Sequence, residues 1–509
     1  MVETFTHFFH QLGGLLNPFN LVVLLAAVTM GIAFGALPGL TATLGIALLT
    51  TATATLDLPL EVTMIALMGV YVGAIYGGCH PAVLLNIPGT AAGAASAVEG
   101  YPLCKQGRGG EAIATATVTS FGGTVFGVLA MLLLAPMLTV LALKFQSSEK
   151  FLLAFFGVLI CGSLTAPDMP LKGWIAGLLG VFLATVGIDP IHGYQRFTFD
   201  TTELVGGIKP IPVILGAFAV PQIIRAMMQP TKAGKPPVIS RLWPQLKILK
   251  NNVWNAIRSG LLGVGVGSIP GVGEDIAAWL SYDTAKKVSK EPETFGKGSM
   301  KGLISAETAN NACIGGALIP LLTLGVPGSP PAMMLLGALE LNDVRTGPTL
   351  AMDRPEFIPQ MAAILLWASF TMLVLGFLLS RVSVHVLRIP TAFLMPIVAL
   401  FSVIGAYAFD NSLWDVGFMI AFGVAAYFME ETGYPVAPLV IGLILGPMAE
   451  ENLRRALIDS GGSLAPFFTR PLSLVFLVLI AASVSAQFFF QRKRRLESVE
   501  RGTSDSSEC

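Results

Sequence analysis

The sequence predicts an all-α polytopic membrane protein: an inverted-topology repeat with re-entrant hairpins, broken helices and about 12 membrane segments. Three observations predict this class: an apolar composition, long apolar runs, and paired Pro-Gly breaks between loops of opposite charge. Of the 509 residues, 54% are hydrophobic and only 12% are charged. A soluble domain carries about twice that charged fraction. A lipid bilayer is therefore the expected environment.

Several apolar runs are long enough to cross a hydrocarbon core of about 30 Å, among them 357–380, 389–409 and 470–490. These runs do not alternate apolar with polar residues, which excludes a membrane β-barrel. The N-terminal stretch MVETFTHFFHQ contains no basic residue. It predicts a short interfacial helix rather than a signal peptide.

Pro-Gly pairs, which break helices, recur in a fixed order. The first half contains GALPGLTATLG at 35–45 and LLNIPGT at 84–90. The second half contains GSIPGVGEDIA at 267–277 and LGVPGS at 324–329. A double glycine precedes the second break of each half. Several features that repeat in the same order indicate an internal duplication.

The loops around these breaks carry opposite charge in the two halves. Loop 57–61 has two acids and no base, whereas the matching loop 283–301 has five lysines. After the second break the bias reverses, because 99–111 holds Lys and Arg while 340–356 holds four acids and two Arg. Basic loops remain in the cytoplasm, so the two halves are expected to have opposite orientations. Inverted repeats with broken helices are typical of secondary transporters.

The expected segments follow the chain in order. They are an interfacial N-terminal segment 1–18, a first inverted repeat 19–228 (core 19–111, scaffold helices 112–228), a cytoplasmic linker 229–258, a second inverted repeat 259–448 (core 259–356, scaffold helices 357–448), and a C-terminal loop, last span and basic cytoplasmic tail over 449–509. The linker holds six Lys or Arg and no acid, and the tail contains QRKRR. Segments 19–57 and 253–282 are expected to be re-entrant hairpins entering from opposite sides.

A break inside the membrane exposes backbone groups that protein, ligand or water must satisfy. The N–H groups at a half-helix start attract anions, and the carbonyls at a half-helix end suit a cation. We therefore expect a substrate and ion site around the breaks. The candidates are Pro38, Gly39, Thr41, Asn86, Pro88, Gly89, Thr90, Pro270, Gly271, Glu274, Asp275, Glu307, Asn310, Asn311, Pro327, Gly328 and Ser329. The alternative interpretation is that these breaks only kink and pack helices.

Three acids stand out among these candidates, because ionisable groups inside a membrane are costly and usually functional. Glu274, Asp275 and Glu307 are expected to bind the coupling cation or proton. Glu274 and Asp275 have an equally weighted alternative role, the capping of a helix start. For Asn310 and Asn311 the alternative is interhelical hydrogen bonding.

The sequence contains no motif that indicates an ATPase or an enzyme. It contains no GxxxxGK[ST] motif, which argues against ATP hydrolysis, and no HExxH or GxSxG motif. We expect no enzyme, no nucleic-acid partner, no tightly bound metal and no cofactor besides a coupling Na⁺ or H⁺. The five cysteines form no CxxC pair and are expected to pack as small residues.

The chain resembles the large membrane subunit of the tripartite tricarboxylate transporter family. The matching stretches, in order, are GALPGLTATLG, YGGCHPAVLLNIPGT, EGYPLCKQGRGGEAI, IPGVGEDIAAWLSY, FGKGSMKGLISAETANNACIGGALIPLLTLGVPGS and GYPVAPLVIGLILGPMAEENLRRAL. The chain departs from the family pattern at Cys79, His80, Glu99, Glu274 and Asp275.

The resemblance implies a multi-pass bacterial inner-membrane permease with a cytoplasmic C-terminus. It also implies a small membrane subunit and a periplasmic solute-binding protein as partners. Citrate-like carboxylates would be the substrates, and a Na⁺ or H⁺ gradient would drive uptake. A self-sufficient permease or exporter for another metabolite is the alternative, and a homodimer remains open.

Overall fold

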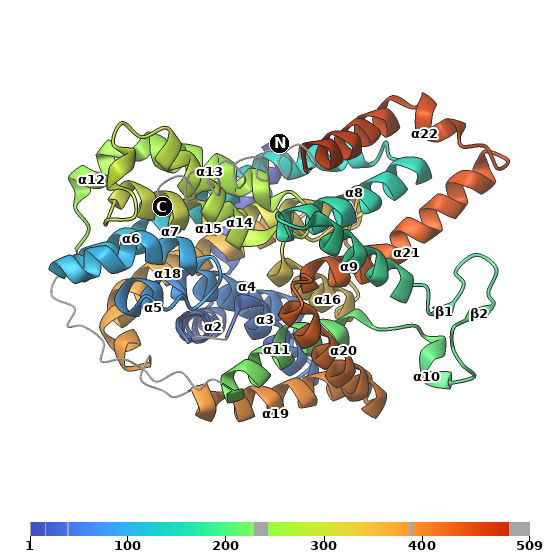
Figure 1. The fold of residues 1–509 in the computed structure, drawn as a ribbon, viewed down its shortest axis with the longest axis horizontal. Coiled ribbons are helices and arrows are strands. Elements are labelled where there is room, and N and C mark those ends of the chain that lie inside the picture. Colours follow the sequence, from blue (N-terminus) through green and yellow to red (C-terminus); the bar gives the residue numbers. More distant parts are fainter. Residues whose placement is uncertain (1, 16, 38–39, 229–242, 387–390, 488–509) are drawn as a thin grey trace, which may run out of the picture. The chain divides into compact units, whose positions relative to one another are not determined.

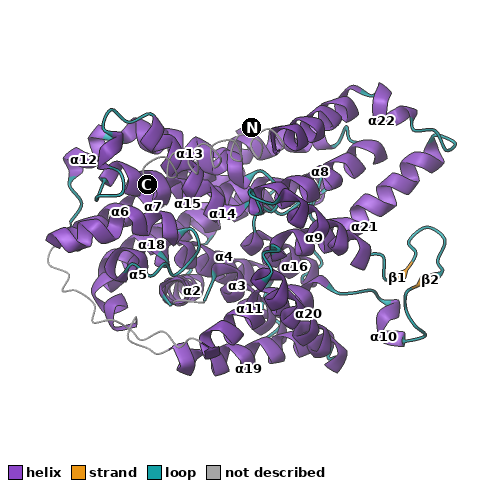
Figure 2. Cartoon of the chain, viewed as in Figure 1, coloured by secondary structure: helices purple, strands orange, loops and turns teal. Residues whose placement is uncertain are grey.

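The computed structural model describes residues 2–15, 17–37, 40–228, 243–386 and 391–487 (Figure 1). Nearly all of the regular structure in these ranges is helical, and a single short hairpin supplies the strands (Figure 2). The candidates Pro38 and Gly39, residues 229–242 of the predicted linker and the basic tail lie outside the described residues.

The elements before the predicted linker are α1 (Val2–Gly14), α2 (Pro18–Ala36), α3 (Ala42–Thr55), α4 (Leu60–Gly77), α5 (Cys79–Leu85), α6 (Gly93–Leu103), the π-helical turn η1 (Cys104–Arg108), α7 (Gly109–Ala142), α8 (Ser147–Thr165), α9 (Pro170–Leu183), β1 (Gly187–Ile188), β2 (Gln195–Arg196), α10 (Thr202–Val205) and α11 (Pro210–Met228). Four of these helices, α7, α8, α9 and α11, occupy most of the region 112–228 where the sequence predicts scaffold helices.

The later elements are α12 (Leu246–Asn251), α13 (Val253–Gly267), α14 (Gly273–Lys287), the 3₁₀ turn η2 (Pro292–Thr294), α15 (Met300–Leu324), α16 (Pro330–Leu341), α17 (Leu350–Asp353), α18 (Phe357–Val386), α19 (Thr391–Asp410), α20 (Leu413–Glu431), α21 (Val436–Asp459), α22 (Ala465–Thr469) and a last apolar helix over Pro471–Gln487. Within the described ranges, eight helices are long and apolar enough to cross a membrane, and shorter apolar helices accompany them. The predicted all-α polytopic class is confirmed.

The chain folds into two compact units. Unit 1 comprises residues 1–143 and 209–428, and unit 2 comprises residues 144–208 and 429–509. Both predicted broken-helix cores lie in unit 1. The candidate site is therefore a property of unit 1 alone.

The second break of each core packs against the first helix of the same core in the same way. A Cβ atom added to Gly89 would collide with the carbonyl oxygen of Gly35. A Cβ atom added to Gly328 would collide with the carbonyl oxygen of Gly267. Glycine is therefore required at both breaks, because the loop backbone touches the helix backbone.

The helices leading into the breaks repeat this relationship. Gly31 on α2 packs on the backbone of Val70 on α4, and Gly263 on α13 packs on the backbone of Ala309 on α15. Close approach through small residues is how helices associate in lipid, where burial of apolar surface gives little drive. The internal duplication thus appears in the packing. The opposite membrane orientation, which depends on loop charge, stays a prediction.

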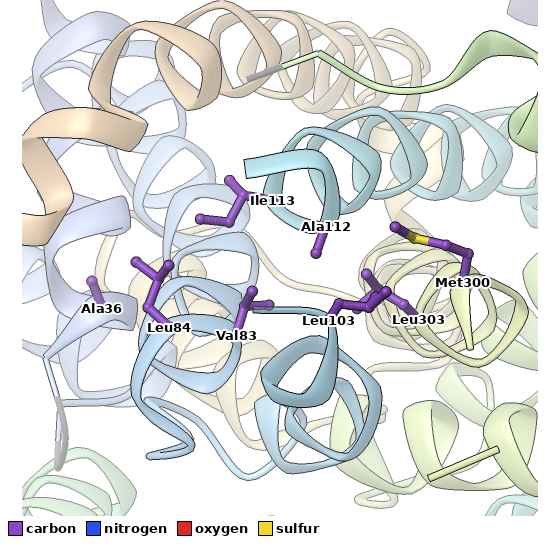
Figure 3. Packing of buried hydrophobic residues seen from close by; sticks show 8 residues of the cluster. All are labelled: Ala36, Val83, Leu84, Leu103, Ala112, Ile113, Met300 and Leu303. Carbon is purple, nitrogen blue, oxygen red and sulfur yellow. The ribbon is translucent and has the colours of Figure 1, made fainter. Parts of the chain in front are cut away.

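An apolar cluster joins the two cores (Figure 3). Its side chains come from α2, α5, α6, α7 and α15 and are Ala36, Val83, Leu84, Leu103, Ala112, Ile113, Met300 and Leu303. Helices of the first core thereby pack directly on α15 of the second.

In unit 2, α21 packs along α8 and α9, and β1 pairs with β2 in an antiparallel hairpin. The buried carboxylate of Asp189 fixes the hairpin loop, because it accepts hydrogen bonds from the backbone N–H groups of Ile191 (2.8 Å) and His192 (2.9 Å). Arg454 of α21 donates to the same carboxylate at 2.6 Å. The hairpin is therefore tied to α21 by a buried ion pair.

Candidate functional site

The two breaks of the second core hold each other by backbone hydrogen bonds. The N–H of Gly271 donates to the carbonyl of Pro327 at 3.1 Å, and the N–H of Gly273 donates to the carbonyl of Gly328 at 3.1 Å. Gly271 and Gly273 have φ values of 69° and 78°, a region that favours glycine. Pro270 is buried beside them. Two segments far apart in the sequence thus form one irregular junction, and their backbone groups satisfy each other.

Glu274 and Ser329 begin the two helices that leave this junction. Ser329 is the N-cap of α16 and accepts a hydrogen bond from the N–H of Ala332 at 3.3 Å. Glu274 lies in the first turn of α14, where the helix dipole favours negative charge. Tyr71 on α4 donates a hydrogen bond to the carboxylate of Glu274, and its oxygen lies 2.8 Å from the Ser329 hydroxyl. A helix of the first core therefore bridges both breaks of the second.

Asp275 does not share this environment, although it follows Glu274 directly. Its side chain is exposed, whereas that of Glu274 is buried. The pair of acids predicted together is thus divided between the interior and the surface of unit 1.

Glu307 forms a second polar cluster within the helices. The hydroxyl of Ser96 on α6 donates to one carboxylate oxygen at 2.5 Å, and the hydroxyl of Ser120 on α7 donates to the other at 2.9 Å. All three side chains are buried. Across the part of the chain that the structure describes, no Lys, Arg or His forms an ion pair with Glu307 or Glu274. A buried carboxylate without a positive partner is costly unless a proton or a cation neutralises it.

Asn310 and Asn311 follow Glu307 on α15 and are both buried. The side-chain N–H of Asn311 donates to the backbone carbonyl of Glu307 at 3.0 Å. The amide oxygens of both asparagines have no hydrogen-bond partner among the described residues. Buried acceptors without donors are rare in proteins and call for an explanation.

Most of the candidate residues of the first core lie at the starts and ends of helices. Thr41 caps α3 by accepting a hydrogen bond from the N–H of Leu44 at 3.2 Å. Asn86 ends α5 in the left-handed conformation with φ of 56°, and its side chain is exposed, as is that of Pro88. Thr90 is buried, and its hydroxyl accepts from the N–H of Gly93 at 3.2 Å.

The structure thus brings together only part of the predicted set. Tyr71 joins Glu274 to Ser329, and Glu307 lies beside Asn311. Among the described residues, no hydrogen bond joins Asn86 or Thr90 to either group. The candidate site therefore consists of two polar clusters in unit 1.

Sequence reasoning missed Tyr71, Ser96 and Ser120. Tyr71 carried a usable signal, because it lies within an apolar run and a buried tyrosine hydroxyl requires a partner. The two serines carried none, since serine also serves as a small packing residue in membrane helices.

Glu99 was noticed only as a departure from the family pattern. Its buried carboxylate accepts hydrogen bonds from three backbone N–H groups, those of Gly296 (2.6 Å), Gly298 (2.9 Å) and Ser299 (2.6 Å). The hydroxyl of Tyr282 is a fourth donor, at 2.8 Å. Glu99 thus anchors the loop that leads into α15, the helix that carries Glu307.

Discontinuous helices that meet around buried acids are typical of multi-pass membrane transport proteins. Residues 21–441 match the tripartite tricarboxylate transporter TctA family, and the chain belongs to this family. It is 35% identical over 471 residues to an uncharacterized 52.8 kDa protein in the TAR-I ttuC′ 3′ region of Agrobacterium vitis, a match covering 92% of this chain and 93% of the relative. It is also 36% identical over 214 residues to an uncharacterized protein in the TAR-II ttuC′ 3′ region of the same organism. That second match covers 42% of this chain and 88% of the relative. No solved structure matches.

The TctA family provides the large subunit of tripartite tricarboxylate-type transporters. The chain is accordingly a multi-pass membrane transport protein, and membership implies a protein that is not an enzyme.

Proposed function

We propose that the chain imports citrate-like tricarboxylates or related carboxylates across a bacterial inner membrane, driven by a Na⁺ or H⁺ gradient. A periplasmic solute-binding protein delivers the substrate, and a small membrane subunit completes the transporter. The family match supports the transport role, and the buried acids of unit 1 support the coupling ion.

The observation that carries this proposal is the bridge from Tyr71 to Glu274 and Ser329. Tyr71 belongs to the first core, whereas both of its partners start half-helices of the second. Relative movement of the cores must break or re-form these hydrogen bonds. The strength of these hydrogen bonds also depends on whether the Glu274 carboxylate is ionised, protonated or paired with a cation.

Charge explains why substrate and ion would bind together. A carboxylate substrate brings negative charge into a region that already holds Glu274 and Glu307. The first half contributes no Lys or Arg before Lys105, so side chains of that segment cannot balance the charge. A bound cation or proton offsets both the buried acid and the substrate, which favours joint binding.

Reconstitution tests the proposal. The chain, its small subunit and its binding protein would be placed in proteoliposomes, and uptake of labelled citrate and smaller carboxylates measured under separate Na⁺ and pH gradients. We expect uptake to stop when the driving gradient is collapsed and to need no ATP. Uptake that required ATP and no gradient would refute coupling. Uptake without the binding protein would favour the self-sufficient permease.

The predicted topology has a separate test in a cysteine-free background. The loop charges predict that Ser240 lies in the cytoplasm and Thr346 in the periplasm. An impermeant thiol reagent applied to intact cells should therefore label Thr346→Cys and spare Ser240→Cys until the membrane is opened. Labelling of Ser240→Cys in intact cells would overturn the inverted orientation.

A further inference from the structure

The carboxylate of Glu307 lies where three helices meet, and hydroxyl groups contact both of its oxygens. Glu307 is 1% exposed, Ser96 is 1% exposed and Ser120 is 0% exposed. Each serine hydroxyl donates its hydrogen to the carboxylate and retains oxygen lone pairs that can accept. Two hydroxyl oxygens that can still accept therefore lie beside the carboxylate.

The two amide oxygens without partners belong to the same turn of α15. Asn310 and Asn311 follow Glu307 by three and four residues, a spacing that places side chains on the same helix face. Asn310 is 2% exposed and Asn311 is 0% exposed, and neither amide oxygen accepts a hydrogen bond from any described residue. Buried amide oxygens require a hydrogen-bond donor or a cation, and the described protein atoms supply neither.

Close packing fixes the backbone that carries these oxygens. Gly123 on α7 lies against the backbone of Thr308, and Gly127 lies against Gly315. Because neither contact leaves room for a Cβ atom, α15 is held tightly against the helix that provides Ser120. The donor set is thus preorganised rather than assembled from mobile loops.

We propose that Glu307, the hydroxyls of Ser96 and Ser120, and the amide oxygens of Asn310 and Asn311 bind a monovalent metal cation, which we assign as Na⁺. This inference rests on the proposed function and assigns its coupling ion to one of the two clusters. Carboxylate, hydroxyl and amide oxygens are hard ligands and suit hard cations rather than the soft metals that thiolates bind.

Charge and hydrogen bonding distinguish a monovalent metal ion from a divalent ion and from a proton. One carboxylate neutralises one positive charge, whereas a divalent ion would leave net charge buried. A proton on Glu307 would satisfy the carboxylate and leave both amide oxygens unpaired. The Glu274 cluster lacks such orphaned oxygens among the described residues, so it does not show the same need for a metal ion.

Ion-dependent stability of the purified full-length chain in lipid nanodiscs tests the site without any transport assay. The unfolding midpoint would be titrated with NaCl at constant ionic strength in choline chloride, then with KCl. A ligand that binds only the folded state raises this midpoint in a saturable way. We expect Na⁺ to do so in the wild type, and Glu307→Gln to abolish the Na⁺-specific shift.

Smaller changes keep the test decisive if Glu307→Gln fails to fold. Ser96→Ala and Ser120→Ala each remove one ligand and should raise the half-saturating Na⁺ concentration about tenfold. Thr124→Val is the matched control, because Thr124 lies one turn beyond Ser120 and donates only to a helix carbonyl at 3.1 Å. It should leave the Na⁺ response unchanged.

Absence of a Na⁺-specific shift in the wild type, or an unaltered half-saturation in the two serine variants, would overturn the site. Carboxylate uptake driven by a pH gradient without Na⁺ would refute the ion assignment and leave the proposed function intact. Na⁺ binding that depends on Glu307, without any carboxylate uptake, would support the ion site and refute the proposed function.

Discussion

The phenol of Tyr71 donates a hydrogen bond to the carboxylate of Glu274, which lies 203 residues later in the chain. Both side chains are buried, and Ser329 completes the group at 2.8 Å from the phenol oxygen. The contact joins α4 of the first core to the start of α14 in the second. It is therefore a direct link between the two cores. In alternating-access carriers built from inverted repeats, the repeats move relative to each other.

Tyr71→Phe removes this link and little else. A hydrogen bond to a charged group contributes about 1.5–3 kcal/mol. We expect folded protein to be recovered, with the half-saturating ion or substrate concentration, or the maximal rate, changed by about tenfold or more. Uptake kinetics in proteoliposomes, measured with the folded yield, would show this.

Tyr76→Phe is the matched control for this change. Tyr76 is also buried on α4, and its hydroxyl bonds the Thr117 hydroxyl at 2.7 Å. Its loss should lower stability by about 0.5–1.5 kcal/mol without altering ion dependence. Equal kinetics in both variants and the wild type would mean that the Tyr71 bridge has no part in coupling.

The sequence predicted the class and the breaks because both depend on local patterns. Apolar runs gave the membrane helices, and the second break of each core shows the left-handed helix end that such motifs favour, at Asn86 and Gly325. The family resemblance is confirmed as well. The substrate and ion residues stay predictions, since geometry alone does not assign a ligand.

The contacts within the two polar clusters could not be predicted from local sequence patterns. Helical periodicity relates residues three or four apart, whereas the contact between Ser96 and Glu307 spans 211 residues. The hairpin at 187–196 was also missed, because its strands have only two residues each and leave no periodic pattern.

Alanine at the equivalent glycines tests the structural repeat. The methyl group in Gly89→Ala or Gly328→Ala would meet a backbone carbonyl oxygen that cannot rotate away. Overpacking of this kind costs about 1–3 kcal/mol, so both variants should unfold at lower temperature and give less folded protein. Gly122→Ala on α7 is the control, because its added methyl meets nothing within 4 Å. Wild-type stability in either break variant would contradict the shared packing.

Acid should loosen the hairpin of unit 2. Burial alone raises the pKa of Asp189, but hydrogen bonds from the His192 N–H, the Arg454 guanidinium and the Ile191 N–H outweigh it and hold the pKa well below its usual range. A depressed pKa gives stability that is present above the unfolded value of about 3.9 and is lost as pH falls through the folded value.

Hydrogen exchange of residues 187–196 would show this loss. Protection should be constant from neutral pH to about pH 5 and should fall progressively in stronger acid. Asp189→Asn, which cannot ionise, should show weaker protection at neutral pH and a flatter acid response. Protection that stays unchanged in strong acid in the wild type would rule out the ion pair as the tie.

The final prediction concerns Asn310, whose buried amide oxygen has no hydrogen-bond partner among the described residues. Asn310→Ala removes that oxygen without breaking a hydrogen bond that its oxygen makes within the described protein. If the oxygen contacts a bound ion or substrate, its loss costs about 0.5–3 kcal/mol of binding. The apparent affinity should then fall by roughly 3- to 100-fold while the folded yield stays near normal. Asn342→Ala is the control, because the Asn342 amide donates to a helix carbonyl of Ala338 at 2.8 Å outside both clusters. The half-saturating concentrations of substrate and cation, measured together with the unfolding midpoint, separate a packing role from a binding role. If Asn310 only packs, the variant unfolds at a lower midpoint and its affinity is unchanged. If Asn310 binds a ligand, the affinity falls and the midpoint without ligand is unchanged.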